Sequence, residues 1–94
     1  MNKDKILNLI NNSINKISEE FDIELNTEND KIYVYSELGT FDSMMLVVLI
    51  AEIEEELLLN FKMEVTLTSD KAMAKSTPFE SNLSILSLII ESQN

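Results

Sequence analysis

The sequence predicts an all-α fold: a small bundle of three main helices and one short helix, with a long loop between the first two main helices. Three observations favour this fold. Apolar residues recur at helical spacing along three long segments. Short polar side chains that suit helix N-termini precede the later segments. The chain has 94 residues and 45% hydrophobic content, which suffices for one modest core. We therefore expect a single domain over residues 1–94.

The first helix is expected from Lys3 to Phe21. Isoleucines and a phenylalanine recur there at steps of four and three, which places them on one face of a helix. These residues are Ile6, Ile10, Ile14, Ile17 and Phe21. Asparagines occupy other faces, so the segment reads as an amphipathic helix packed on a core.

Residues 22–42 carry weaker signals. The run 26–30 has the composition of a polar turn, and 32–35 is β-branched and aromatic. Two interpretations remain open. In one, residues 21–25 and 31–35 form a β-hairpin. In the other, which we favour, the segment is a long ordered loop whose aromatic side chains pack on the core.

The second helix is expected to begin at Asp42 or Ser43, since either side chain can cap the free N–H groups of a first turn. Its buried stripe is expected to comprise Leu46, Leu49, Ile50, Ile53, Leu57 and Phe61. Glutamates 52 and 54–56 form an acidic outer surface further along.

Two elements are expected in the last third of the chain. A short helix is predicted over Asp70–Lys75. Thr77 is a suitable N-cap, Pro78 suits the first helical position and Glu80 completes a capping box, so the last helix is predicted from there to about Ser92. Its apolar face is expected to carry Phe79, Leu83, Leu86 and Ile90.

Composition excludes several classes of chemistry. The chain has no Cys, His or Trp, which rules out disulfides, thiolate catalysis, Cys/His zinc sites and a Ser-His-Asp triad. The chain has seven lysines and 17 acidic residues, which gives a net charge of −10. Such a chain is repelled by nucleic acid and anionic membranes and attracted to basic protein surfaces, unless the charge serves solubility alone. The longest apolar run, residues 44–51, is too short to span a bilayer, so a cytoplasmic location is expected.

The segment 38–44, Leu-Gly-Thr-Phe-Asp-Ser-Met, is the main candidate for a functional site. It holds the only glycine and places Asp42 and Ser43 at the start of a helix. The simplest interpretation is that one of these two residues caps the helix. A functional interpretation is that Ser43 carries a phosphate ester, because a helix N-terminus stabilises an anion. Gly39 would permit a close backbone approach, for a turn or for a partner.

At these residues the chain resembles the acyl carrier and peptidyl carrier protein family. That family has an Asp-Ser-Leu motif after a Leu-Gly lead, at the start of a second helix rich in apolar residues and glutamates. The resemblance extends through residues 53–57 and the last helix with Leu83 and Ile90. It implies a monomeric carrier and no enzyme activity of its own.

The resemblance implies that a phosphopantetheinyl transferase moves 4′-phosphopantetheine from coenzyme A to Ser43. The thiol of this cofactor then holds acyl or aminoacyl groups as thioesters for an activating ligase and acceptor enzymes with basic patches. Asp42 and Met44 would contribute to transferase recognition, and Mg²⁺ would belong to the transferase reaction. Partner enzymes would contact Met45, Val48, Glu54 and Glu55.

Two departures from the family are visible. Met44 replaces the usual leucine, and Val48 stands where fatty-acid carriers have a glutamate. These changes favour a specialised, stand-alone bacterial carrier in lipid or specialised biosynthesis over a housekeeping fatty-acid carrier.

The alternative is an acidic helical adaptor that binds partners through a methionine-rich face. Its residues would be Met44, Met45, Met63 and Met73. A calcium site at 26–30 fails for lack of ordered ligand spacing and a turn glycine. An independent hydrolase fails because only a carboxylate could serve Ser43 as base, and the adjacent Asp42 does not face it.

Overall fold

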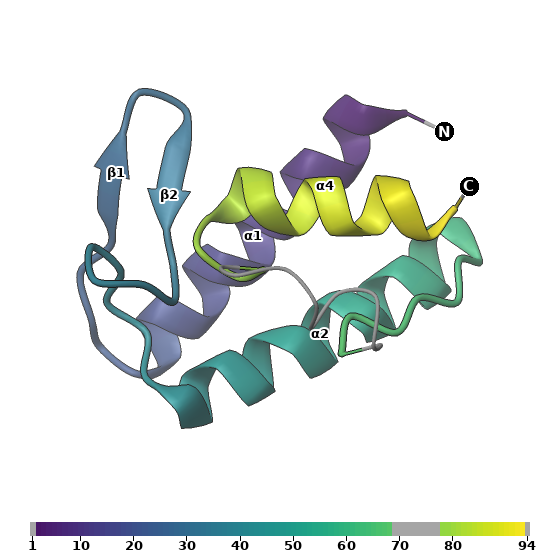
Figure 1. Ribbon diagram of the computed structural model, residues 1–94. Helices are drawn as coiled ribbons and strands as arrows, with labels where there is room; N and C mark the ends of the chain where they lie inside the picture. Colours follow the sequence, from purple (N-terminus) through teal and green to yellow (C-terminus); the bar gives the residue numbers. More distant parts are fainter. Residues whose placement is uncertain (1, 69–77, 94) are drawn as a thin grey trace.

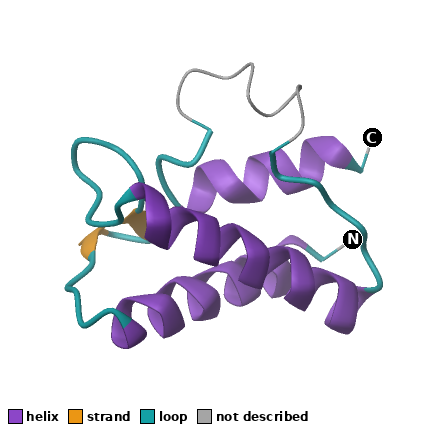
Figure 2. Cartoon of the chain, turned by 90° about the horizontal axis from the view of Figure 1, so that it is seen from below, coloured by secondary structure: helices purple, strands orange, loops and turns teal. Residues whose placement is uncertain are grey.

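A computed structural model describes residues 2–68 and 78–93. The described elements, in chain order, are α1 (Lys3–Glu20), β1 (Asn26–Glu28), β2 (Lys31–Tyr33), α2 (Ser43–Phe61) and α4 (Asn82–Ser92). Helix α1 packs against both α2 and α4, and it therefore forms the centre of the core. The hairpin lies at one end of the molecule, and both chain termini lie toward the other (Figures 1 and 2).

The fold is α+β, so the prediction of an all-α bundle is wrong. Strands β1 and β2 form an antiparallel sheet in which Asn26 pairs with Tyr33 and Glu28 with Lys31. The connecting pair is Asn29–Asp30, and Asn29 adopts a left-handed φ of 56°. Asparagine tolerates that conformation better than most residues. The favoured long loop is also wrong. The hairpin alternative is correct in type, but its first strand lies at 26–28, inside the predicted turn.

A two-stranded hairpin is marginal in water, and this one is held by the segment before α4. Tyr33 forms a β-bridge with Ser81. The next two amides of the chain donate to the same segment: Val34 N–H to the Glu80 carbonyl at 2.8 Å and Tyr35 N–H to the Phe79 carbonyl at 3.0 Å. Residues 79–81 thus run beside residues 33–35 and form backbone hydrogen bonds with them, as a neighbouring strand would.

Helix α1 follows its prediction closely. The side chain of Asn2 caps it by accepting from Lys5 N–H at 3.1 Å. Four isoleucines of the predicted face are buried: Ile6, Ile10, Ile14 and Ile17. The helix ends at Glu20, one residue earlier than expected, and Phe21 is its C-cap with 40% of its surface exposed. Phe21 is therefore not part of the core face, because the next residue, Asp22, turns the chain with a φ of 55°.

Helix α2 also begins where predicted. Its fully or largely buried residues are Met45, Leu46, Leu49, Ile53 and Leu57. Ile50 and Phe61 are only partly buried. Lys62 ends the helix in a left-handed conformation (φ 54°), and its N–H donates to the Leu58 carbonyl at 3.0 Å. No helix among the described residues is long and apolar enough to cross a membrane.

Helix α4 starts later than predicted and presents a different face. Its N-cap is Ser81, whose hydroxyl accepts from Ser84 N–H at 3.3 Å. Glu80 is not part of a capping box; its carboxylate lies 3.0 Å from the Lys31 ammonium. The buried residues of α4 are Asn82, Ile85, Leu88 and Ile89, whereas Leu83 is 39% exposed. Thr77 and the predicted short helix Asp70–Lys75 lie outside the described residues.

Candidate functional site

The serine singled out by the sequence is positioned by the loop between β2 and α2. Two backbone hydrogen bonds close this loop: Gly39 N–H donates to the Ser36 carbonyl at 3.0 Å, and Phe41 N–H donates to the Val34 carbonyl at 3.1 Å. Phe41 is buried in the core, and the chain enters α2 directly after it. The start of α2 is therefore fixed from one side by an anchored aromatic side chain.

Gly39 makes this loop possible through close backbone approach. Its φ is not in the left-handed region, so handedness does not require glycine here. A Cβ at this position would lie 2.0 Å from the Val34 carbonyl oxygen and 2.4 Å from the Val34 carbonyl carbon. Of the two interpretations of Gly39, a turn within the chain or the approach of a partner, the structure supports the first, because the close contact is with the chain's own backbone.

The first turn of α2 assigns different roles to Asp42 and Ser43. Asp42 is the N-cap: its Oδ1 accepts from Met45 N–H at 2.8 Å, and its carbonyl accepts from Leu46 N–H at 3.0 Å. Ser43 is the first helical residue and is exposed. Its hydroxyl forms no hydrogen bond with the part of the chain that the structure describes. Asp42 therefore caps α2 without help from Ser43, and the Ser43 hydroxyl remains accessible.

The described surroundings of Ser43 contain neither a free neighbouring carboxylate nor a metal-binding cluster. The Asp42 carboxylate is engaged with the helix end, so it is not placed as a general base for its neighbour. Within residues 2–68 and 78–93, no group of three His, Cys, Asp or Glu side chains could hold a metal ion. The positive end of the α2 dipole stabilises an anion bound there.

The predicted partner-contact residues are not all on the surface. Met45 is only 4% exposed and Val48 is half-buried. Glu54 accepts from Leu67 N–H at 2.8 Å and so ties down the segment that follows α2. Of these four residues only Glu55 is exposed. Met44, expected to contact the transferase, is 69% exposed.

The residues that the sequence interpretation missed lie on the far side of α2 from the core. Val47 and Leu59 are each 67% exposed, Leu58 is 48% exposed, and Ala51 is exposed as well. The available signal was two uninterrupted apolar runs, residues 44–51 and 57–59, since a helix with one buried stripe normally has polar residues on the opposite face. Among the described members of the proposed methionine-rich face, only Met44 is well exposed. Met45 is buried, Met63 is partly buried, and Met73 lies outside the described residues.

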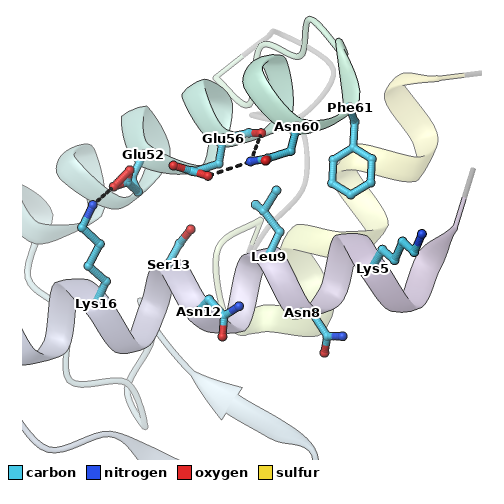
Figure 3. A pocket seen from close by; sticks show the side chains of 10 residues that line it. All are labelled: Lys5, Asn8, Leu9, Asn12, Ser13, Lys16, Glu52, Glu56, Asn60 and Phe61. Atoms are coloured by element: carbon cyan, nitrogen blue, oxygen red, sulfur yellow. Dashed lines mark hydrogen bonds and ion pairs between the residues drawn. The ribbon is translucent and has the colours of Figure 1, made fainter.

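A hollow of about 470 Å³ lies between α1 and the C-terminal half of α2 (Figure 3). The ion pair between Lys16 and Glu52, 2.6 Å long, lies at one end, and Leu9 and Phe61 provide apolar walls toward the other. Glu52 is nine residues beyond Ser43, or about 14 Å along the helix axis. The hollow is therefore separate from the serine.

The Lys16–Glu52 pair gives the fold a predicted pH dependence. The hydrogen bond and the charge of Glu52 raise the pKa of Lys16 above its ordinary 10.5. Because the folded state holds this proton more tightly than the unfolded chain, the stabilisation is fully present below pH 10.5 and is lost as the pH rises through the raised pKa. Denaturant unfolding of wild type and Lys16→Gln should therefore show a small, constant difference at neutral pH that vanishes in strong alkali. Lys3→Gln is the matched control, and a difference that persists in strong alkali contradicts the assignment.

Comparison of the chain with protein-family models, with curated proteins and with solved structures found no match. A functional interpretation therefore depends on the residues and the geometry described above.

Proposed function

We propose that this protein is a carrier that bears 4′-phosphopantetheine on Ser43 and presents acyl or aminoacyl thioesters to partner enzymes. The observation that carries the proposal is the exposed serine hydroxyl directly after an aspartate that caps α2 by itself. The resemblance of residues 38–44 to the carrier-protein motif indicates which group Ser43 would bear, a phosphopantetheine arm. A chain without cysteine or histidine can handle thiol chemistry only if the thiol is brought to it.

The residues present fit the prosthetic group. A phosphodiester on Ser43 would lie at the positive end of α2, where its charge is stabilised. In the loading step the Ser43 oxygen would form a bond to the phosphorus of the pantetheine arm and displace the nucleotide of coenzyme A, and the serine proton would pass to a base of the transferase. The chain's own contribution is to hold the hydroxyl outward, with Asp42 and the exposed Met44 beside it.

The partner surface needs revision from the sequence prediction. Met45 and Glu54 are committed to the protein's own structure, so they are poorly suited to partner contacts. Met44, Val47 and Glu55 are accessible and are the better candidates near the serine. Ligase and acceptor enzymes would meet them with apolar and basic side chains.

The proposal is tested by loading. The full chain is incubated with coenzyme A, Mg²⁺ and a broad-specificity phosphopantetheinyl transferase, and its intact mass is measured. Wild type should gain one phosphopantetheinyl group, whereas Ser43→Ala should gain none. Ser87→Ala, at an exposed serine of α4, is the matched control and should load like wild type. An unmodified wild type, or an equal gain on Ser43→Ala, contradicts the proposal.

A further inference from the structure

We propose that the hollow between α1 and α2 binds a small organic ammonium ion, a protonated primary amine on a short apolar chain. The hollow measures about 470 Å³, which lies within the range of small-molecule sites. Leu9 and Ser13 line it from α1, and Glu56, Asn60 and Phe61 line it from α2. The inference does not depend on the proposed carrier function, because the hollow is separate from the serine at the start of α2.

The buried hydroxyl of Ser13 is the first observation that points to a ligand. Ser13 is only 4% exposed, and Figure 3 shows its hydroxyl directed from α1 toward α2. It forms no hydrogen bond with any residue that the structure describes. A buried hydroxyl without a partner is costly, and native proteins nearly always provide one from the protein, from water or from a ligand. We therefore expect the partner of this hydroxyl inside the hollow.

The carboxylate of Glu56 is the second observation. Its Oε2 accepts from Asn60 Nδ2 at 2.8 Å, and the same nitrogen donates to the Glu56 carbonyl at 3.0 Å. Asn60 thus holds the carboxylate in one orientation, but its neutral amide does not compensate the charge. Glu56 is half-buried and forms no ion pair with a described lysine, whereas Glu52 is paired with Lys16. Glu56 therefore contributes an oriented, unpaired negative charge to the hollow.

These two groups and the walls beside them specify the ligand. Ser13 and Glu56 lie across the hollow from each other, and the oxygen atoms of both can accept hydrogen bonds from one ammonium group (Figure 3). Leu9 precedes Ser13 by one helical turn, about 6 Å, and forms an apolar wall together with Phe61. An alkyl chain attached to the ammonium would cover this wall and remove its apolar surface from water.

Other occupants fit less well. An anion would meet the Glu56 carboxylate in a chain whose net charge is −10. An uncharged hydrocarbon would displace water from Ser13 and Glu56 without replacing its hydrogen bonds. A metal ion lacks ligands, since no group of three His, Cys, Asp or Glu side chains in the described ranges could hold one. Water alone could bond to Ser13, but it would leave the Glu56 charge unpaired and the apolar wall uncovered.

Binding is measured on the isotope-labelled full-length protein by changes in amide chemical shifts during NMR titration. Hexylammonium chloride is the probe. Methylammonium chloride, which lacks the chain, and sodium hexanoate, which lacks the cation, are the controls. Hexylammonium should give saturable shifts at the amides of Leu9, Ser13 and Glu56 and none at Ser43. Methylammonium should bind about tenfold more weakly, and hexanoate should not bind.

Variants locate the site. Glu56→Gln should weaken hexylammonium binding about tenfold, because it removes the charge and keeps the shape of the side chain. Glu55→Gln is the matched control: it removes the same charge at an exposed position of α2 outside the hollow and should leave binding unchanged. Ser13→Ala should weaken binding about threefold. It should not lower the melting temperature of the free protein, because no hydrogen bond to a described residue is lost.

Any of four results overturns the inference. Hexylammonium gives no saturable shift at the hollow, a control compound binds as tightly as hexylammonium, or Glu55→Gln weakens binding as much as Glu56→Gln. The fourth is a lowered melting temperature of Ser13→Ala, which would show that the hydroxyl already has a partner within the protein. None of these results affects the mass-gain test on Ser43, so the two proposals are separately falsifiable.

Discussion

Gly39→Ala is expected to destabilise the protein by about 3 kcal/mol, close to the upper end for overpacking. The added methyl group would meet the Val34 carbonyl at 2.0 Å, which no real Cβ contact reaches. That carbonyl cannot move away cheaply. It accepts from Phe41 N–H, the Val34 amide donates to Glu80, and the Val34 side chain is fully buried.

Thr40→Ala is the matched control, because Thr40 is exposed and lies next in the same loop. It should change the free energy of unfolding by no more than about 0.5 kcal/mol. Urea denaturation followed by circular dichroism measures both variants. Equal midpoints for Gly39→Ala and Thr40→Ala would show that the loop adapts to a side chain at position 39.

Asn82→Ala is expected to cost about 3 kcal/mol, from an unsatisfied buried network and a small cavity. Asn82 is fully buried at the start of α4. Its Nδ2 donates to Asn11 Oδ1 at 2.8 Å and to the Asp30 carbonyl at 3.0 Å, and its Oδ1 accepts from Ile32 N–H at 2.9 Å. One amide thus joins α1, the hairpin and α4.

The network interpretation predicts coupling between its members. Asn11→Ala and Asn82→Ala should not be additive, whereas Asn12→Ala, at an exposed asparagine of α1, should add independently to either. Thermal or chemical denaturation of the singles and doubles gives the coupling free energy. A value near zero for the Asn11–Asn82 pair would mean that the two side chains do not support each other.

Local signals accounted for α1 and the start of α2. The isoleucines of α1 recur at helical spacing and are all buried, and α2 is capped by Asp42, one of the two residues that the sequence offered as its cap. In these elements the information is held within a few neighbouring residues. The cap is three residues from the amide it satisfies, so it can be read from the chain directly.

The start of α4 shows where local signals fail. Thr77, Pro78 and Glu80 have the composition of a helix start, yet α4 begins at Asn82. Residues 79–81 pair with the chain at 33–35 instead, and Glu80 forms its ion pair with Lys31. Those partners are more than 40 residues away in sequence. The hairpin was only the less favoured alternative, and its first strand was placed too early, for the same reason: β1 is a short polar strand that is stabilised by pairing with β2, and β2 in turn contacts the segment before α4.

For the candidate site, too, some features follow from the sequence and others only from the tertiary structure. The sequence by itself determined which residues can carry chemistry: one Asp-Ser pair at a helix start, in an acidic chain without cysteine or histidine. Periodicity also predicted the buried stripe of α2, in which Leu46, Leu49, Ile53 and Leu57 are buried as expected. Only the tertiary structure decided which of the remaining apolar residues face outward, because residues 44–51 are apolar on every side of the helix. Packing against α1 buries Met45 and Leu49 and leaves Met44, Val47 and Leu59 in solvent. Composition follows from the chain alone, whereas exposure depends on which surfaces the neighbouring elements cover.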